Sequence, residues 1–236
     1  MIEGLPDNLK SLSGGKDEDC EIRFNGASTI FRIENVHDDS FARVLYKHFN
    51  ESLKLEPWIE LAILTFHTEG KRFEAHLVTR GPSSNPEHIR FALKGEDARR
   101  RLETAQKVLD CATCMYRAAV SGPVPFFERA SEDIYKGNQK QALELLEKDL
   151  QYSAELKYIF GDEEPEDILN VEAQDEDYKI TDQVIPDVKE NRISKAKLFA
   201  DFVYKKYDET VEKLNPDKTK PVGGLNQDDN ADGTYE

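Results

Sequence analysis

The sequence predicts one α/β (α+β) domain in which an antiparallel or mixed sheet is flanked by helices. Two observations lead to this prediction. Short runs before residue 48 alternate in polarity or are rich in β-branched residues, whereas apolar stripes at helical spacing occupy most of the later chain. A length of 236 residues, with 38% hydrophobic and 33% charged residues, suits one soluble, charge-rich domain with tails.

The first half of the chain is expected to hold the sheet. Residues 1–19 are rich in Gly, Asp and Ser and predict an irregular segment. Runs typical of strands follow at 21–24, 29–33, 41–46, 72–79 and 88–93. Between the third and the fourth run, apolar residues around Trp58 cover most of a helix circumference over 53–68. This pattern indicates a buried helix rather than an aromatic platform for nucleic-acid bases.

The second half is expected to be helical. Leu102, Ala105, Leu109 and Ala112 recur at spacings of three and four, which predicts an amphipathic helix over 95–120. Further helices are expected at about 126–136, 139–151, 154–160 and 192–214. Residues 162–190 contain twelve acidic and two basic residues with little periodicity, which predicts a loosely ordered acidic excursion. Residues 215–236 are expected to form a disordered tail.

Composition narrows the function classes. The net charge of −15 argues against a free-standing nucleic-acid-binding protein, because contacts to phosphate need a concentrated positive surface. No apolar run approaches the ~20 residues that cross a bilayer. The first residues lack the basic and apolar segments of a signal peptide, and three cysteines are too few for a disulfide framework. We therefore expect a cytoplasmic protein with no membrane contact.

Motifs for nucleotide or metal chemistry are weak in this chain. Residues 13–17 lack the first glycine and the final hydroxyl of a phosphate-binding loop, so no ATP site is expected. Nucleases of the restriction-enzyme type place an acidic metal ligand two positions before a lysine on a strand. Four such pairs occur, about the number that composition gives by chance: Glu69/Lys71, Glu155/Lys157, Asp177/Lys179 and Asp187/Lys189. None follows a strand with a further acidic residue, so no catalytic, cofactor-binding or metal-binding residue is predicted.

Two clusters on the helix predicted at 95–120 have more than one interpretation. Cys111 and Cys114 lie one turn apart, but a structural zinc or an iron–sulfur cluster usually needs four ligands, and no second pair is spaced to supply them. We interpret both as core thiols. Arg99, Arg100 and Arg101 are weak candidates for contacts to DNA phosphate, although their acidic surroundings favour a solvated helix face.

Two blocks of the sequence point to a family. The first is RVLYKHFNESLKLEPWIELAIL (43–64), in which a strand-like segment leads into a helix with Trp58-Ile59-Glu60. The second is MYRAAVSGPVPFFERASEDIYKGNQKQALE (115–144), in which a helix ends before a proline–phenylalanine connection. Both resemble the C-terminal domain of RecC, the gamma chain of exodeoxyribonuclease V. In the second block the positions that match the family pattern are Tyr116, Arg117, Gly122, Pro123, Pro125, Phe126, Phe127 and Tyr135. Residues 155–169 and 193–211 are similar to weaker blocks, so the resemblance spans roughly 20–214.

The resemblance implies a restriction-endonuclease-like fold that has lost its catalytic residues. It also implies a non-catalytic part of a helicase–nuclease that processes DNA double-strand ends for recombinational repair. The implied partners are the beta (RecB-like) and alpha (RecD-like) chains, which would supply the ATP and Mg²⁺ chemistry, and duplex DNA ends reached through the complex. On this interpretation Trp58, Tyr116, Pro123, Pro125, Phe126, Phe127 and Tyr135 are core or partner-interface anchors.

Two alternatives stay open at the level of sequence. One is a standalone, divergent Mg²⁺-dependent nuclease that uses Asp177 and Lys179. The other is a truncated remnant that keeps only protein interactions, because family gamma chains are much longer and carry helicase-like domains before this one. Co-purification with the beta chain and a cleavage assay on linear duplex DNA separate these possibilities.

Overall fold

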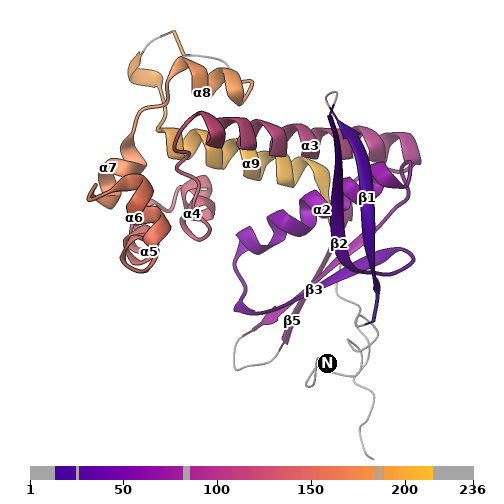
Figure 1. Cartoon of the computed structure of the whole chain (residues 1–236). Coiled ribbons are helices and arrows are strands. Elements are labelled where there is room, and N and C mark those ends of the chain that lie inside the picture. Colours follow the sequence, from indigo (N-terminus) through magenta and orange to yellow (C-terminus); the bar gives the residue numbers. More distant parts are fainter. Residues whose placement is uncertain (1–13, 25–26, 82–85, 184–185, 188, 215–236) are drawn as a thin grey trace, which may run out of the picture.

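The computed structural model describes residues 14–24, 27–81, 86–183, 186–187 and 189–214. Within them a mixed six-stranded sheet has strands in sequence order across it, with helices packed against it (Figure 1). The strands are β1 (Lys16–Phe24), β2 (Ala27–Val36), β3 (Ser40–His48), β4 (Glu74–Arg80), β5 (Pro86–Leu93) and β6 (Val211–Leu214). The expected α/β class is confirmed at this level.

The antiparallel alternation of the strands is interrupted once, between β3 and β4. β1, β2 and β3 form the antiparallel meander that the sequence predicts. β3 and β4 are parallel neighbours, with Phe41 opposite Ala75 and Val44 opposite Val78. β4, β5 and β6 are again antiparallel. A parallel pair needs a crossover connection, and here that connection includes the helix α2 (Leu55–His67).

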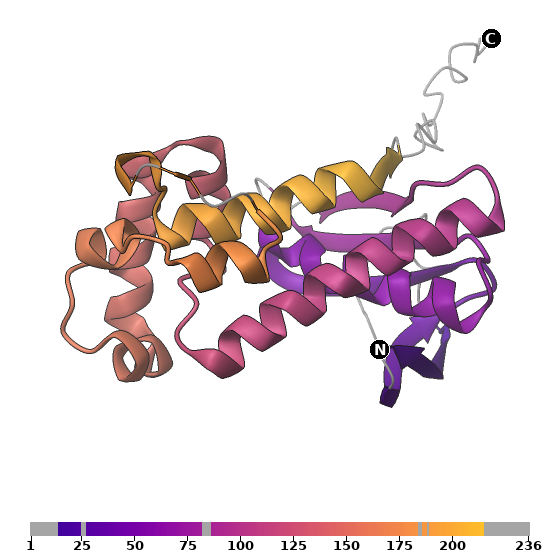
Figure 2. The same ribbon diagram turned by 90° about the horizontal axis from the view of Figure 1, so that it is seen from above.

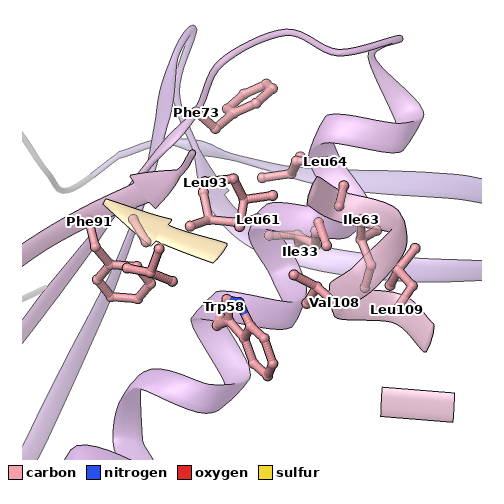
Figure 3. Packing of buried hydrophobic residues seen from close by; sticks show 14 of the residues in the cluster. Ile33, Trp58, Leu61, Ile63, Leu64, Phe73, Phe91, Leu93, Val108 and Leu109 are labelled. Atoms are coloured by element: carbon pink, nitrogen blue, oxygen red, sulfur yellow. The ribbon is translucent and has the colours of Figure 1, made fainter. Parts of the chain in front are cut away.

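The main hydrophobic core lies between the sheet and the helices α2, α3 (Ala98–Ser121) and α9 (Lys195–Thr210). α2 is buried around most of its circumference, as predicted, and Trp58 and Leu61 are almost fully enclosed. Figure 3 shows how side chains from α2, α3 and the strands converge, among them Ile33, Phe91 and Val108. This core fixes the sheet to the two long helices.

A second, smaller core lies at the other end of the molecule. It is built by α4 (Ala130–Lys136), α5 (Gln139–Tyr152), α6 (Ala154–Phe160) and α7 (Pro165–Asn170), against the first half of α9. Leu146, Ile168, Ala196 and Ala200 are buried there. Figure 2 shows these helices gathered at the end of α9 away from the sheet. α9 therefore contributes side chains to both cores.

The structure differs from the sequence expectation near the N-terminus. Residues 16–19 were expected to be irregular but belong to β1, where Glu18 lies opposite Ile33 and Asp19 opposite Arg32. Ion pairs of Arg32 with Asp17 and with Asp19, both at 3.6 Å, offset the like charges along this strand. Cross-strand pairing of this kind has no local signature, so sequence reasoning missed it. Residues 1–13 lie outside the described part.

The acidic excursion expected at 162–190 contains two short helices, α7 and α8 (Asp175–Ile180). Each is held by a few apolar side chains: Ile168 and Leu169 of α7 and Tyr178 of α8 are buried. Pro165 begins α7, and a capping box between Gln174 and Asp177 begins α8. Helices of six residues are too short to show a period, so composition alone suggested loose order.

Two further boundaries moved. The helix expected from about 126 begins at Ala130, because residues 123–127 form no regular structure and a turn at 128–129 precedes the helix. The helix expected to 214 ends at Thr210, and the last four residues become β6 on the edge of the sheet. The indole Nε1–H of Trp58 donates to Thr210 Oγ1 (3.0 Å), which fixes the point where helix gives way to strand. Residues 215–236 lie outside the described part.

Candidate partner-binding surface

The proline–phenylalanine connection is covered mostly by the chain itself. Pro125 and Phe127 are buried, whereas Pro123 is exposed. The ring of Phe127 contacts that of Phe160 at 5.7 Å between centroids, and its backbone N–H donates to Ser131 Oγ (2.7 Å). Proline restricts its own φ and the residue before it, and the backbone N–H of Phe126 donates to the carbonyl oxygen of Val124 (2.8 Å), so a tight turn at Pro125 delivers Phe127 into the second core.

Three aromatic rings join this connection to α9. Phe126 stacks on Tyr204 at 6.0 Å, and Tyr135 stacks on Tyr204 at 5.5 Å between ring centroids. The hydroxyl of Tyr135 donates to Asp208 Oδ2 (3.0 Å). Stacked aromatic pairs of this kind contribute about 0.5–1.5 kcal/mol each beyond their burial. Phe126 and Tyr135 are thus internal anchors rather than free interface side chains.

The other predicted anchors separate into a core residue and a surface residue. Trp58 is 2% exposed and packs edge-on against Tyr207, with ring centroids 5.6 Å apart. Tyr116, one turn before the end of α3, is 70% exposed, as is Val120. Of the seven anchors, only Tyr116 and Pro123 lie on the surface.

The three arginines at the start of α3 have different partners within the domain. Arg99 Nε donates to Glu103 (3.0 Å), and Arg100 lies 3.8 Å from Glu96. Arg101 turns inward and donates to the carbonyl oxygens of Gly70 (2.8 Å) and Gly95 (3.1 Å). Each guanidinium already has a partner within the domain, which favours the solvated and structural interpretation of this triplet.

The four acidic–lysine pairs are scattered over the fold. Asp177 accepts from the backbone N–H of Gln174 (2.9 Å) and lies 3.2 Å from Lys195 Nζ, so its carboxylate caps α8. Lys179 is exposed. Glu69 and Lys71 lie in the turn before β4, Glu155 and Lys157 are exposed on α6, and Asp187 lies in a loop. Within the described residues no three His, Cys, Asp or Glu side chains are grouped as a metal ion would require.

Cys111 and Cys114 line a cavity of about 590 Å³ between α3, α9 and the chain after α8. Burial raises the pKa of the Cys111 thiol to about 12, and burial also raises the pKa of Cys114. A reactive cysteine needs a thiolate, so both thiols are poor nucleophiles at neutral pH. The cavity wall carries cations and carboxylates in mixture, including Lys107, Asp110 and Asp182, and selects no charge class of ligand.

An ion pair that sequence reasoning missed joins the two ends of the first resemblance block. Arg43 on β3 donates through Nε to Glu60 Oε2 (3.2 Å) and through Nη2 to the other oxygen, and Glu34 lies 3.1 Å from Nη1. Burial raises the pKa of Glu60, and the guanidinium opposes that shift. The glutamate of the Trp-hydrophobic-Glu pattern is therefore a buried partner of the sheet, not an exposed functional group.

One region combines exposed apolar groups with unpaired charge. α6 has no buried residue and rests on the second core through Leu156 and Phe160. Tyr158 and Ile159 point away from that core, at 92% and 50% exposure, and Tyr152 at the end of α5 is 80% exposed. Six exposed carboxylates lie on or next to α6: Glu155, Asp162, Glu163, Glu164, Glu166 and Asp167. We call these nine residues the acidic tyrosine surface.

The carboxylates of this surface have no cationic partner among the described residues. In the described part of the chain none of the six lies within 4.0 Å of a Lys, Arg or His nitrogen of another described residue. Elsewhere several carboxylates form ion pairs with residues far away in the sequence, such as Asp149 with Arg129 and Asp175 with Arg192. Self-repulsion among unpaired carboxylates destabilises the compact state, so this concentration has no evident role in folding.

The sequence contained part of this signal. Tyr158 and Ile159 follow each other in a helix only seven residues long, so at most one side of it can be covered by a core. Sequence reasoning instead considered the proline–phenylalanine connection as a core or partner-interface segment, because that segment is apolar and ordered by proline. Which apolar segment is covered depends on how α9 packs, and that is a tertiary property.

Comparison with known proteins adds no relative, since neither a protein-family model nor a curated protein matched the chain. In addition, no described helix combines the length and apolarity that spanning a membrane requires.

Proposed function

We propose that this chain is a non-catalytic domain of an exodeoxyribonuclease V-type helicase–nuclease that processes DNA double-strand ends for recombinational repair. The proposal includes a restriction-endonuclease-like fold that has lost its active site. The observation that carries it is the combination of a mixed sheet flanked by helices with acidic–lysine pairs that serve other roles or lie apart. A nuclease of this class needs carboxylates converging on a metal ion.

The position of the resemblance blocks supports the proposal. Arg43 and Glu60, near opposite ends of the first block, hold β3 against α2. Phe126 and Tyr135 of the second block hold the connection against α9. The residues on which the resemblance rests are thus mostly those that build the domain. In a non-catalytic domain we expect the residues shared with a family to be those that maintain the fold, not residues that carry out a reaction.

On this proposal the chemistry belongs to the partner chains. The beta (RecB-like) and alpha (RecD-like) chains bind ATP and Mg²⁺, unwind the duplex and cut it in the cytoplasm. This chain would contribute packing surface and hold its partners in place around the DNA end. A domain with a formal charge of −15 fits such a role better than direct DNA binding, because DNA contact would bring like charges together.

Reconstitution tests the proposal. We expect the tagged full chain to co-purify with beta-type and alpha-type chains, and ATP-dependent degradation of linear duplex DNA to fall when it is omitted. Failure to associate with either chain would overturn the proposal. Association without any effect on degradation would identify an interaction-only remnant instead.

The rival nuclease function is tested separately. We expect no Mg²⁺-dependent cleavage of linear duplex DNA by the chain alone. Asp177→Ala also removes the cap of α8, which costs about 1 kcal/mol, so it is paired with Lys179→Ala at an exposed position. Cleavage that both substitutions abolish would establish the standalone enzyme.

A further inference from the structure

We infer that the acidic tyrosine surface binds an arginine-rich segment of a partner protein. This inference deepens the proposed function, because it rests on the chain acting as an assembly component and names the chemistry of what it holds. Figure 1 places α5, α6 and α7 together at the end of the molecule away from the sheet. That end is therefore available to a second chain without displacing the helices that cover one face of the sheet.

The exposed tyrosines argue for a protein contact. Tyr152 and Tyr158 leave 80% and 92% of their surface in water, although tyrosine is enriched at the centres of protein interfaces. Ile159 adds an aliphatic group on the adjoining position. By contrast, Tyr135 and Tyr204 stack on each other. Large exposed side chains on α6 and at the end of α5 indicate a surface that becomes buried on association.

The unpaired carboxylates select the charge of the partner. Asp162, Glu163 and Glu164 follow Tyr158 within six residues and have no ion pair among the described residues. Nucleic acid and anionic membrane surfaces would be repelled by them. A second copy of the chain would bring the same negative surface against itself. A basic protein segment remains as the occupant that removes the repulsion.

Arginine fits this surface better than lysine. Its planar guanidinium donates to carboxylates in pairs and also stacks on aromatic faces, and residues 158–163 supply both kinds of group within one short exposed stretch. Tyr158 offers a free ring face, and Asp162 and Glu163 offer free oxygens four and five positions later. Lysine presents a compact charge, which is less suited to contact an aromatic ring and a pair of carboxylate oxygens at the same time.

Peptide binding by the full chain tests the inference. The probes are fluorescein-labelled nona-arginine and nona-lysine, followed by fluorescence anisotropy at low and at physiological ionic strength. We expect nona-arginine to bind more tightly, and the binding to weaken as salt screens the carboxylates. Equal affinity for the two probes would show attraction to net charge alone and would overturn the inference.

Matched variants locate the contact. Tyr158→Ala is expected to weaken nona-arginine binding about 5–10-fold, and the triple change Asp162→Asn, Glu163→Gln and Glu164→Gln about tenfold or more at low salt.

The control variants change the same kinds of side chain elsewhere in the molecule. Tyr46→Ala removes a tyrosine that is 81% exposed on β3. The triple change Asp17→Asn, Glu18→Gln and Asp19→Asn removes an equal number of negative charges, three, from β1. Both controls should change affinity by less than about twofold. Equal losses in controls and test variants would refute the assignment of the site.

Two outcomes keep this inference distinct from the proposed function. If the chain fails to associate with beta-type and alpha-type chains while Tyr158→Ala still weakens peptide binding, the surface is real and the proposed assembly is wrong. Sedimentation of the chain alone tests the second copy as occupant. A dimer that Tyr158→Ala dissociates would replace the arginine-rich partner and overturn the inference.

Discussion

The half of the molecule built on the sheet and the half built by α4–α7 use their side chains differently. Around the sheet, twenty residues form one buried core, and carboxylates such as Glu60 and Glu74 lie beside arginines. In the helical half, ten residues form the core, and the six carboxylates at α6 and the start of α7 have no ion pair among the described residues. The carboxylates that hold the sheet are thus neutralised by arginine, whereas those at α6 face the solvent without a cation from the described part of the chain.

The comparison indicates that one half of the molecule supplies most of the stability and that the other half presents the surface for association. The larger core supplies most of the hydrophobic stabilisation, at about 25 cal/mol per Å² of apolar surface removed from water. The smaller core holds α6 through Leu156 and Phe160 and leaves the other side of that helix free. α9 connects the halves, since Val203 and Tyr207 belong to the first core and Ala196 and Ala200 to the second.

The largest effect is expected in the sheet half. Trp58→Ala should lower the free energy of unfolding by about 3–5 kcal/mol, because it empties a buried site and leaves the hydroxyl of Thr210 without its indole donor. Urea unfolding followed by far-ultraviolet circular dichroism measures the change. Trp58→Phe keeps most of the volume and should cost less. A loss below about 1 kcal/mol for Trp58→Ala would show that this core is not the main source of stability.

A matched truncation in the helical half asks whether the two halves unfold together. Leu146→Ala removes a fully buried side chain of α5 and should cost about 2–5 kcal/mol. Because α9 belongs to both cores, we expect one cooperative transition, displaced to lower urea concentration. Two separated transitions, with the helices melting first, would show that α9 does not couple the halves.

Acid should weaken the sheet half through His76. Burial, followed by His88 and Arg90, lowers the pKa of His76 to about 4, and Glu74 opposes the shift less strongly. The unfolded chain takes up this proton near pH 6.5 and the folded chain near 4. The stabilisation present above pH 6.5 is therefore lost as the pH falls from 6.5 to 4. The loss would reach roughly 3 kcal/mol, since each unit of pKa difference is worth about 1.4 kcal/mol.

Unfolding midpoints between pH 7 and pH 4 check this expectation. His76→Gln should flatten the decline of stability over that window, whereas His48→Gln changes an exposed ring at the end of β3 and should not. The neighbours that face His76 are Glu74, His88 and Arg90, with His37 further away, and they are the same in both variants. An unchanged slope in His76→Gln would place the acid sensitivity elsewhere.

Elements that depend on local sequence patterns were predictable, whereas features that depend on tertiary contacts were not. The buried helix around Trp58 and the antiparallel meander follow from apolar spacing and β-branched runs, and both are confirmed. β6 and α7 are four and six residues long, too short for a period to be visible. The acidic tyrosine surface was missed for a different reason. Phe126 is covered through its stacking on Tyr204 in α9, which lies far along the chain and which local spacing does not indicate.

The smallest effect on stability is expected at a residue whose loss should clearly weaken binding. Tyr158→Ala removes a side chain that is 92% exposed and contacts no core, so the free energy of unfolding should change by less than about 0.5 kcal/mol. Phe160→Ala, two positions later on the same helix, removes the ring that meets Phe127 and should cost clearly more. Urea unfolding of both variants measures the contrast. If Tyr158→Ala destabilised the protein as much as Phe160→Ala, Tyr158 would belong to the fold. The Tyr158→Ala variant would then not report on association alone. The distinction between residues that stabilise the fold and residues that are free to bind a partner would not hold for α6.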